Sequence, residues 1–260
     1  MKFYHKVSSE WLANRKNFLT ASAIQELLPL TPTGRKRNID KATLAIYAGK
    51  LTEVMEQEIE SRSWAARGHL FEPYAIDQYN KHAPFAWPTL HHWDNVLIHG
   101  NGVAFSPDAM SFELDSSIDK TMIHRTRVHD SASSVTIGEV KCYEAKGHYA
   151  TASADPMELS ERWQIATSMY VLHTIETGHL ILFNPSAKHK LFVRQYTRAD
   201  LKDEIAMIDD IVNDYFDAVA KLDKEFNALA ISDIKITEQE IINELQSQQE
   251  QWKHKNPLAL

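Results

Sequence analysis

Two carboxylates and a lysine in the middle of the chain have the residue types needed to hydrolyse a phosphodiester. Asp108 follows Ser106-Pro107, and Glu139-Val140-Lys141 follows an apolar run later in the chain. Alternate residues of a strand share a face, so Glu139 and Lys141 are expected to point the same way while Val140 points into the core. Two carboxylates could hold Mg²⁺ or Mn²⁺ through oxygen ligands, and a neighbouring lysine could position a water for attack on phosphorus.

An isolated E-x-K sequence has a plainer interpretation, because Glu139 and Lys141 could form a surface ion pair on an edge strand. Two features favour a site. Asp108 lies at the end of an apolar strand, and Glu139 ends another apolar run. Without a metal the two carboxylates would repel each other, so one of them is expected to have a raised pKa.

The patterns around these residues predict a mixed α/β chain. Apolar residues at helical spacing predict helices over 11–28, 64–79, 161–173 and 201–229, and short β-branched runs predict strands at 96–98, 103–105, 135–137, 178–183 and 191–193. Ser22 with Gln25 resembles a capping box, as does Thr237 with Glu240 before a last helix. We therefore expect a core over residues 1–200 and a helical extension over 201–260 packed on the same domain.

Composition excludes several classes of protein. The 260 residues are 43% hydrophobic and 24% charged, which are ordinary globular proportions. No apolar run is long enough to span a bilayer, and the first residues lack the apolar region of a secretory signal. The single cysteine, Cys142, excludes an intramolecular disulfide framework and a cysteine-rich metal site, so a cytoplasmic protein without a membrane partner is expected.

The net charge of −7 by itself argues against a nucleic-acid partner, but the charges are unevenly distributed. Residues 1–70 carry 11 basic and 7 acidic side chains, whereas residues 201–260 carry 6 basic and 13 acidic ones. The acidic tail accounts for the whole net charge. The remainder of the chain is neutral and is basic at its front, which leaves a nucleic-acid partner open.

Four sequence blocks together resemble the phage lambda exonuclease or YqaJ-like viral recombinase family, also called alkaline exonucleases, of the PD-(D/E)xK nucleases. They are residues 11–15 (WLANR) with 20–22 (TAS), 67–73 (RGHLFEP), 105–108 (FSPD) and 139–142 (EVKC), and a weaker fifth block spans 164–170. The resemblance covers about residues 9–197. It implies a restriction-endonuclease-like core, with a mixed central sheet flanked by helices.

The resemblance also implies a role for each matching residue. Asp108 and Glu139 would bind the metal with the Val140 carbonyl, and Lys141 would orient the attacking water. Glu72, on a helix, would help to hold metal or water. The 5′-phosphate and DNA would be bound by a set of polar residues, namely Arg15, Ser22, Ser106 and Gln164. An arginine fork and hydroxyls near a helix start suit a phosphate monoester.

The implied activity is a Mg²⁺-dependent exonuclease, with Mn²⁺ as a substitute, that degrades one strand of linear double-stranded DNA from a 5′-phosphate end. It would release 5′-mononucleotides and leave a 3′ overhang. The family also implies a homotrimer and a single-strand annealing protein as partner. Two alternatives stay open: a PD-(D/E)xK endonuclease of restriction or repair type, and an inactive DNA-binding module on the same fold.

Among the departures of the chain from the family pattern, two concern the site most directly. Asp108 and Glu139 are 31 residues apart, where the family has about ten, so residues 113–134 are expected to form a longer hairpin reaching away from the site. We expect its basic side, with Arg125 and Arg127, to contact duplex DNA or to separate its strands. The alternative is an insertion on the surface without a role in DNA binding. Ala166 also stands where relatives often have a second glutamine.

Overall fold

The structure is a computed structural model of the chain. It describes residues 14–29, 36–51, 63–93, 96–112, 123–131, 134–229, 240 and 242–247. The chain divides into two compact units, Met1–Val219 and Ala220–Leu260. The candidate site lies in the first unit. In the second, the described residues are the end of a long helix and a short helical stretch at 242–247.

A five-stranded mixed sheet forms the centre of the first unit. Its strand order is β2 (His91–His92), β5 (Ala109–Met110), β7 (Val135–Lys141), β8 (Ile175–Phe183) and β9 (Leu191–Thr197). The strands β7 and β8 are parallel, and the other neighbours are antiparallel. The residues of β7 and β8 are mostly buried, as expected for parallel strands covered on both faces.

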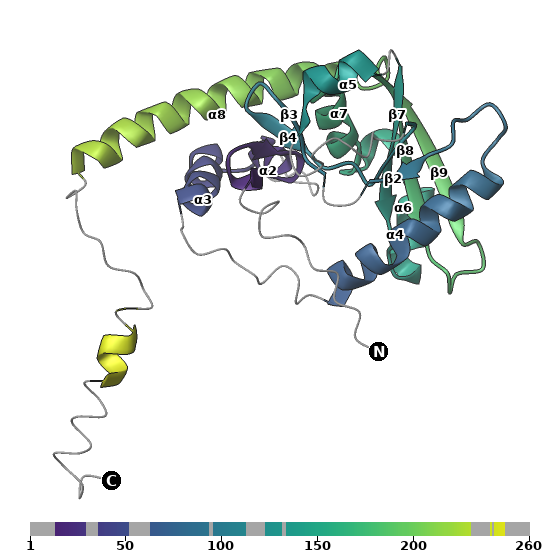
Figure 1. Cartoon of the computed structure of the whole chain (residues 1–260), viewed down its shortest axis with the longest axis horizontal. Helices are drawn as coiled ribbons and strands as arrows, with labels where there is room; N and C mark the ends of the chain where they lie inside the picture. The colour runs from purple at the N-terminus through teal and green to yellow at the C-terminus, as the bar shows by residue number, and fades with distance from the viewer. Residues whose placement is uncertain are drawn as a thin grey trace, which may run out of the picture. The chain divides into compact units, whose positions relative to one another are not determined.

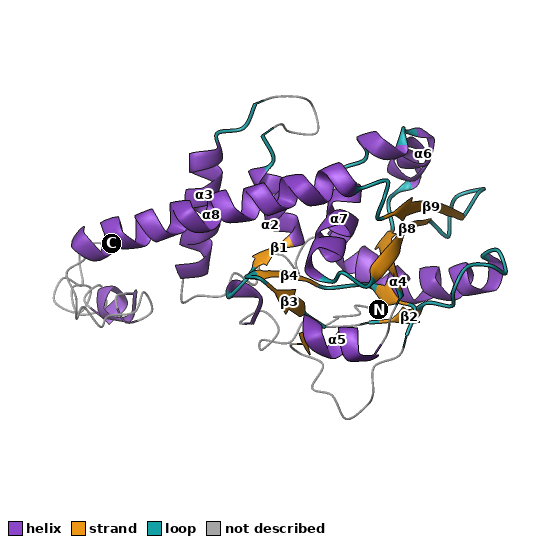
Figure 2. Cartoon of the chain, turned by 90° about the horizontal axis from the view of Figure 1, so that it is seen from above, coloured by secondary structure: helices purple, strands orange, loops and turns teal. Residues whose placement is uncertain are grey.

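A helix covers each face of this sheet (Figure 1). On one face, α4 (Ser63–His82) packs Ile76 and Tyr79 against Val140 and Ile181. The other face packs against α7 (Arg162–Val171), where the Ile165 side chain occupies the space that a Cβ on residue 178 would need. In Figure 2 the two helices lie on opposite sides of β8.

A second, four-stranded sheet has the order β1 (Leu19–Thr20), β4 (Val103–Phe105), β3 (Ile98–Gly100) and β6 (Ile123–His124). The turn between β3 and β4 is Asn101-Gly102, with φ values of 54° and 74°, and an Asn-Gly pair suits a tight hairpin that needs positive φ at both positions. After β4 the chain passes through Asp108 directly into β5. One short segment therefore connects the two sheets.

The remaining described elements surround these sheets. They are α2 (Ala21–Leu27), α3 (Ile39–Leu51), α5 (Arg125–Ser131), α6 (Ala145–Ser153), the 3-10 turn η2 (Pro156–Glu158) and α8 (Lys202–Leu229). The first half of α8 adds Ile208, Val212 and Tyr215 to the main core. The division at residue 200 into core and extension stays a prediction. None of the described helices has the length and apolarity needed to cross a membrane.

The mixed α/β class is confirmed. The helices α4, α7 and α8 and the strands β4, β7, β8 and β9 lie where the sequence predicts them, whereas β3 starts two residues later than predicted. Three predictions are wrong. The helix predicted over 11–28 is interrupted by β1, because Leu19 pairs with Val103. The N-cap of α2 is Thr20, whose hydroxyl accepts from the Ala23 N–H at 3.3 Å, because α2 begins directly after β1, two residues earlier than a cap at Ser22 requires. Residues 123–131 form β6 and α5 instead of hairpin strands, because Ile123 and Val128 are buried in the main core. The predicted Thr237 cap and residues 113–122 lie outside the described residues.

Candidate active site

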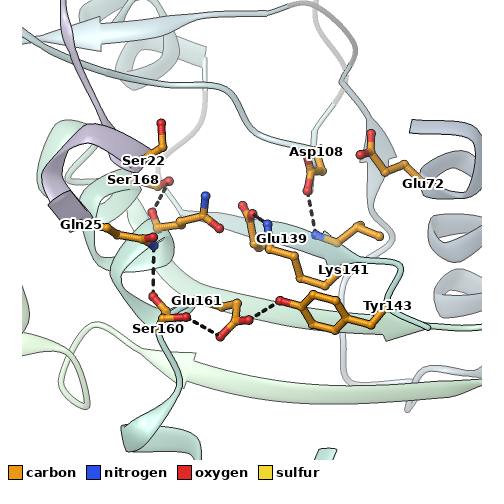
Figure 3. Close-up of polar contacts among 12 residues, drawn as sticks. Ser22, Gln25, Glu72, Asp108, Glu139, Lys141, Tyr143, Ser160, Glu161 and Ser168 are labelled. Atoms are coloured by element: carbon orange, nitrogen blue, oxygen red, sulfur yellow. Dashed lines mark hydrogen bonds and ion pairs between the residues drawn. The ribbon is translucent and has the colours of Figure 1, made fainter. Parts of the chain in front are cut away.

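A cavity of about 770 Å³ opens where β4 and β7 meet the helices α2, α4 and α7. Nine of the predicted site residues line it: Arg15, Ser22, Glu72, Ser106, Asp108, Glu139, Val140, Lys141 and Gln164. They come from segments far apart in the sequence, and Figure 3 shows many of them facing a common space. The structure therefore brings the proposed metal residues and the proposed phosphate residues together.

Asp108 is held at the edge of this cavity by the backbone of β7. The pairing of Ala109 with Gly138 starts the β5–β7 ladder directly after Asp108. The carboxylate continues that ladder, because Asp108 Oδ2 accepts a 2.7 Å hydrogen bond from the Val140 N–H. One oxygen of Asp108 is therefore fixed by the strand.

Glu139 and Lys141 lie on the cavity side of β7, while Val140 packs under α4 as the strand alternation predicts. The Lys141 ammonium lies 2.5 Å from Glu139 Oε1, and the two side chains are 24% and 12% exposed. An ion pair with so little solvent around it is stronger than a surface pair. The surface-pair interpretation of E-x-K therefore does not fit the structure.

Glu72 reaches the same space from α4. Its side chain is 17% exposed, and its carboxylate lies 3.5 Å from His69 Nδ1, one turn earlier on the helix. Figure 3 places Glu72 beside Asp108, across from Glu139. Sequence reasoning missed His69, although it lies inside the RGHLFEP block and lines the cavity.

The charges of these groups act strongly on one another. Burial first, and then Glu139 and Glu72, raise the pKa of Asp108 well above its ordinary value, against the opposing effects of Lys141 and the Val140 N–H. Burial lowers the pKa of Lys141, but the carboxylates of Glu139 and Asp108 outweigh burial and raise it overall. The raised carboxylate pKa matches the prediction that two close acids would repel each other.

These three acids fit a hard divalent cation, because carboxylate oxygens are its preferred ligands and the site carries an excess of negative charge. Across the described parts of the chain, no set of three or more His, Cys, Asp or Glu side chains is already gathered closely enough to hold a metal ion. The fit therefore rests on donor chemistry and on the raised pKa of Asp108.

A polar cradle lies on the opposite side of the cavity. Arg15 Nη2 donates to Ser22 Oγ at 3.0 Å, and the hydroxyls of Ser22 and Thr20 are 3.1 Å apart. Burial lowers the pKa of Arg15 from its usual high value, which reflects a guanidinium partly removed from water. Because Thr20 caps α2, the Ser22 hydroxyl is available to the cavity. Thr20 is a cradle residue that sequence reasoning missed.

Gln164 on α7 also lines the cavity, and its backbone carbonyl accepts from the Ser168 hydroxyl at 2.9 Å. Ala166, where relatives often have glutamine, is fully buried in the main core. A larger polar side chain there would be placed in the core rather than in the cavity.

A second polar network, unnoticed in the sequence, lies behind the Lys141 end of β7. The Tyr143 hydroxyl donates a short hydrogen bond to Glu161 Oε1, and Ser160 Oγ donates to the other oxygen at 3.2 Å (Figure 3). Gln25 Nε2 donates to the Ser160 carbonyl at 3.1 Å. The network ties β7 to α2. Burial and the bond to Glu161 raise the pKa of Tyr143, so its phenol stays protonated.

The two arginines predicted on the insertion do not line the cavity. Arg127 is exposed on α5. The stem of Arg125 is half-buried and lies against Gly100, on the core side of the four-stranded sheet. Of the two, Arg127 is the better placed to meet a ligand from solvent.

A mixed sheet with Asp108, Glu139 and Lys141 at one cavity and an acid from a flanking helix defines the class of PD-(D/E)xK nuclease folds. The model of the YqaJ-like viral recombinase domain matches residues 10–179. The chain therefore belongs to the YqaJ-like viral recombinase family, as the sequence blocks predicted.

Solved structures agree in fold. An alkaline exonuclease (LHK-Exo) from Laribacter hongkongensis is 15% identical over 86% of this chain and 100% of its own, with a TM-score of 0.55. A structure of LHK-Exo in complex with dAMP is 17% identical over 85% and 98%, with a TM-score of 0.57. A phage-related exonuclease from Haemophilus somnus is 12% identical over 78% and 95%, with a TM-score of 0.50. At such identities the likeness concerns the fold. No curated protein matches the chain.

Proposed function

We propose that the protein is a Mg²⁺-dependent exonuclease that degrades one strand of linear double-stranded DNA from its 5′ end. It would release 5′-mononucleotides and leave a 3′ overhang for annealing. The observation that carries the proposal is that three carboxylates and Lys141 share one cavity with the Arg15–Ser22–Thr20 cradle. Membership of the family, and the exonuclease names of the solved neighbours, support nuclease activity on DNA.

Asp108, Glu139, Glu72 and the Val140 carbonyl would hold the metal, with Mn²⁺ able to replace Mg²⁺. The bound ion would supply Lewis-acid polarisation of the phosphoryl oxygen. The Val140 N–H fixes one oxygen of Asp108, so the other oxygen is left in a defined direction. Lys141, held by Glu139, would orient the attacking water through its remaining ammonium protons.

The cradle would give the enzyme its dependence on an end. Arg15 presents a forked donor beside the hydroxyls of Ser22 and Thr20, and Ser106 lines the same wall. A terminal phosphate monoester carries more charge and more acceptor oxygens than an internal diester, so it gains more from these donors. Gln164 would contact the nearby nucleotide. Internal DNA would bind less well.

Three further expectations belong to this proposal. Ring-shaped trimers threading DNA, a single-strand annealing protein as partner, and action in the bacterial or phage-infected cytoplasm all follow from the family resemblance. They do not depend on the chemistry of the cavity. Sedimentation tests the trimer, a pull-down with a phage annealing protein tests the partner, and cell fractionation tests the location.

The deciding experiment digests linear duplexes that carry either a 5′-phosphate or a 5′-hydroxyl. Each duplex is labelled near its 5′ end in one reaction and at its 3′ end in another. With Mg²⁺, we expect mononucleotides from the 5′ end and faster digestion of the phosphorylated duplex. EDTA is the control for metal dependence. Release of mononucleotides from the 3′ end, or no digestion at all, would contradict the proposal.

A closed circular plasmid in the same reaction separates the alternatives. An end-dependent exonuclease spares the circle, whereas an endonuclease of restriction or repair type linearises it. An inactive DNA-binding module would bind the linear duplex and leave both substrates intact. Calorimetric titration of Mg²⁺, with Asp108→Ala as the control, then shows whether such a module still binds metal.

A further inference from the structure

Four residues form a row across one face of the four-stranded sheet. Thr20 on β1 pairs with Ala104 on β4, Ala104 pairs with His99 on β3, and His99 pairs with His124 on β6. Directly opposed residues on neighbouring strands project to the same side of a sheet. Thr20 and Ala104 line the cavity. The two histidines therefore continue the cavity wall outward along the sheet.

The other face of this sheet is occupied by the core. The alternate residues, Leu19, Ile98, Val103, Phe105 and Ile123, are all buried in the main hydrophobic cluster. On the face of the row, His124 is exposed, while Phe18 and His99 are half-buried. Ala104, also in the row, is fully buried, so the accessible part of this face is its outer end at His99 and His124.

The aromatic rings of the row are in mutual contact. Phe18, the residue just before β1, stacks on His99 with a centroid distance of 4.5 Å and an interplanar angle of 29°. The ring of His124 meets His99 edge-on at 5.1 Å. These three residues make an aromatic ledge that begins beside the cradle, since the Phe18 N–H donates to the Arg15 carbonyl at 3.2 Å.

The outer end of the ledge has a hydrogen-bond donor. His124 Nδ1 accepts from the Thr126 N–H at 3.4 Å and lies 2.9 Å from the Thr126 hydroxyl. The neutral tautomer that satisfies these contacts carries its proton on Nε2. Burial, and then the neighbouring His124, lower the pKa of His99, so His99 stays a neutral aromatic ring at neutral pH. The Nε2 proton can donate to a phosphate oxygen of a DNA strand, and the rings beside it offer an apolar surface to the neighbouring sugars.

The spacing also matches DNA. The row crosses three strand intervals, and each interval is about 4.8 Å, so His124 lies about 14 Å from the Thr20 end. At a rise of about 3.4 Å per nucleotide along a DNA strand, this distance corresponds to about four nucleotides. A duplex whose terminal phosphate is in the cradle could therefore reach the ledge.

We propose that Phe18, His99 and His124 form a second DNA-binding site, which holds the duplex about four nucleotides away from the terminal phosphate. This inference rests on the proposed function, because it takes the cradle as the position of the DNA end. It differs from that function in assigning affinity for longer DNA to residues that do not line the cavity. It also involves neither the metal residues nor Lys141.

The test measures DNA binding without metal, so that cleavage does not interfere. Anisotropy of a 5′-phosphorylated duplex of about 20 base pairs gives the Kd, and competition by a 5′-phosphorylated dinucleotide reports the cradle. For Phe18→Leu/His124→Ala we expect a Kd for the duplex about tenfold higher, the size of one lost hydrogen bond to a charged phosphate, and unchanged competition by the dinucleotide. His92→Ala, an exposed histidine of β2 in the other sheet, is the matched control.

Each outcome distinguishes the two proposals. An unchanged Kd for the duplex overturns the ledge and leaves the proposed function intact. Equal weakening of duplex and dinucleotide also overturns it, because the variant would then be acting on the cradle. Because the His124 side chain is exposed, His124→Ala alone should fold normally, so a higher Kd in this variant is not an effect of folding. Failure of the wild-type protein to bind or digest linear DNA would reject the proposed function and the ledge with it.

Discussion

The Val140 N–H donates a 2.7 Å hydrogen bond to Asp108 Oδ2, across a separation of 32 residues in the sequence. The long insertion between them does not disturb this contact, because β5 and β7 pair just beyond Asp108, with Ala109 opposite Gly138 and Met110 opposite Ile137. The inserted residues lie between β5 and β7 in the sequence, and the pairing of these two strands is complete without them. The number of residues between the aspartate and E-x-K can therefore vary without changing the position of Asp108 relative to β7.

This contact makes the structural role of Asp108 separable from its proposed role as a metal ligand. Asp108→Asn keeps an oxygen that can accept from the Val140 N–H but loses the negative charge, so we expect a normal melting temperature with loss of Mg²⁺ binding. Activity should fall about 10³-fold, because the metal contributes several kcal/mol to the transition state. Calorimetry with Mg²⁺ and thermal unfolding measure the two effects.

The matched variant is Asp108→Ala, which loses the hydrogen bond as well. We expect it to unfold at a lower temperature than Asp108→Asn, because a buried N–H without a partner costs about 1–3 kcal/mol. Full Mg²⁺ affinity in Asp108→Asn would show that Asp108 is not a metal ligand.

Lys141 is expected to matter for the chemical step more than for metal binding. Lys141→Ala should reduce the rate of DNA digestion about 10²-fold or more, because water positioning and proton transfer are lost. Its Mg²⁺ affinity should be retained, since the lysine supplies no ligand. Single-turnover digestion and calorimetry give the two values, and a variant with full digestion rate would exclude the assigned role.

Arg15 is expected to control the preference for a phosphorylated end. Arg15→Gln should remove most of the difference in digestion rate between 5′-phosphate and 5′-hydroxyl duplexes, about tenfold or more, because a charge-assisted hydrogen bond contributes about 1.5–3 kcal/mol. Lys16→Gln, the next residue along the chain, is the control. A preserved preference in Arg15→Gln would place the phosphate site elsewhere.

The predicted role of the insertion needs a point substitution rather than a deletion. Removing residues 115–132 would take Ile123 and Val128 out of the core, so reduced DNA binding would not report a lost contact. Arg127→Ala instead should lower the slope of log Kd against log salt by about one, as expected for one lost phosphate contact. Lys188→Ala, an exposed lysine in the turn after β8, is the control and should leave the slope unchanged. An unchanged slope for Arg127→Ala would leave the insertion without a DNA role.

His179 should make the fold sensitive to acid. It is fully buried, its Nδ1 lies 2.8 Å from the Tyr79 hydroxyl, and burial lowers its pKa to about 4. The unfolded chain, with an ordinary histidine pKa near ~6.5, binds the proton first as the pH falls. The stabilising effect is therefore complete above about pH 6.5 and is lost progressively as the pH falls toward 4.

The expected loss of unfolding free energy from this histidine is roughly 2 kcal/mol between pH 7 and pH 5. Denaturant unfolding at the two pH values measures it. His179→Gln is the comparison, because it removes the titrating group and should lose less stability over the same interval. An equal loss in both proteins would assign the acid sensitivity to other groups.

The sequence by itself determined the mixed α/β class, the main helices and the shared face of Glu139 and Lys141, because the two-residue period of a strand and the apolar stripes of α4 and α8 are local signals. The family, and most of the other residues that line the cavity, came from the resemblance of the four sequence blocks. Local patterns, however, could not decide which of two neighbouring residues caps a helix. Thr20 and Ser22 are both good caps, and the departure of the chain from β1 decided between them.

Tertiary structure alone decided what depends on contacts between distant segments. Burial of Ile123 and Val128 turned the expected hairpin into β6 and α5, and the hydrogen bond from Tyr143 to Glu161 joined two segments that share no motif. The row from Thr20 to His124 likewise exists because four short strands pair in one register. The register of these strands is set by burial of the opposite face of the sheet. The sequence of one strand alone does not show which residues of the next strand it will face.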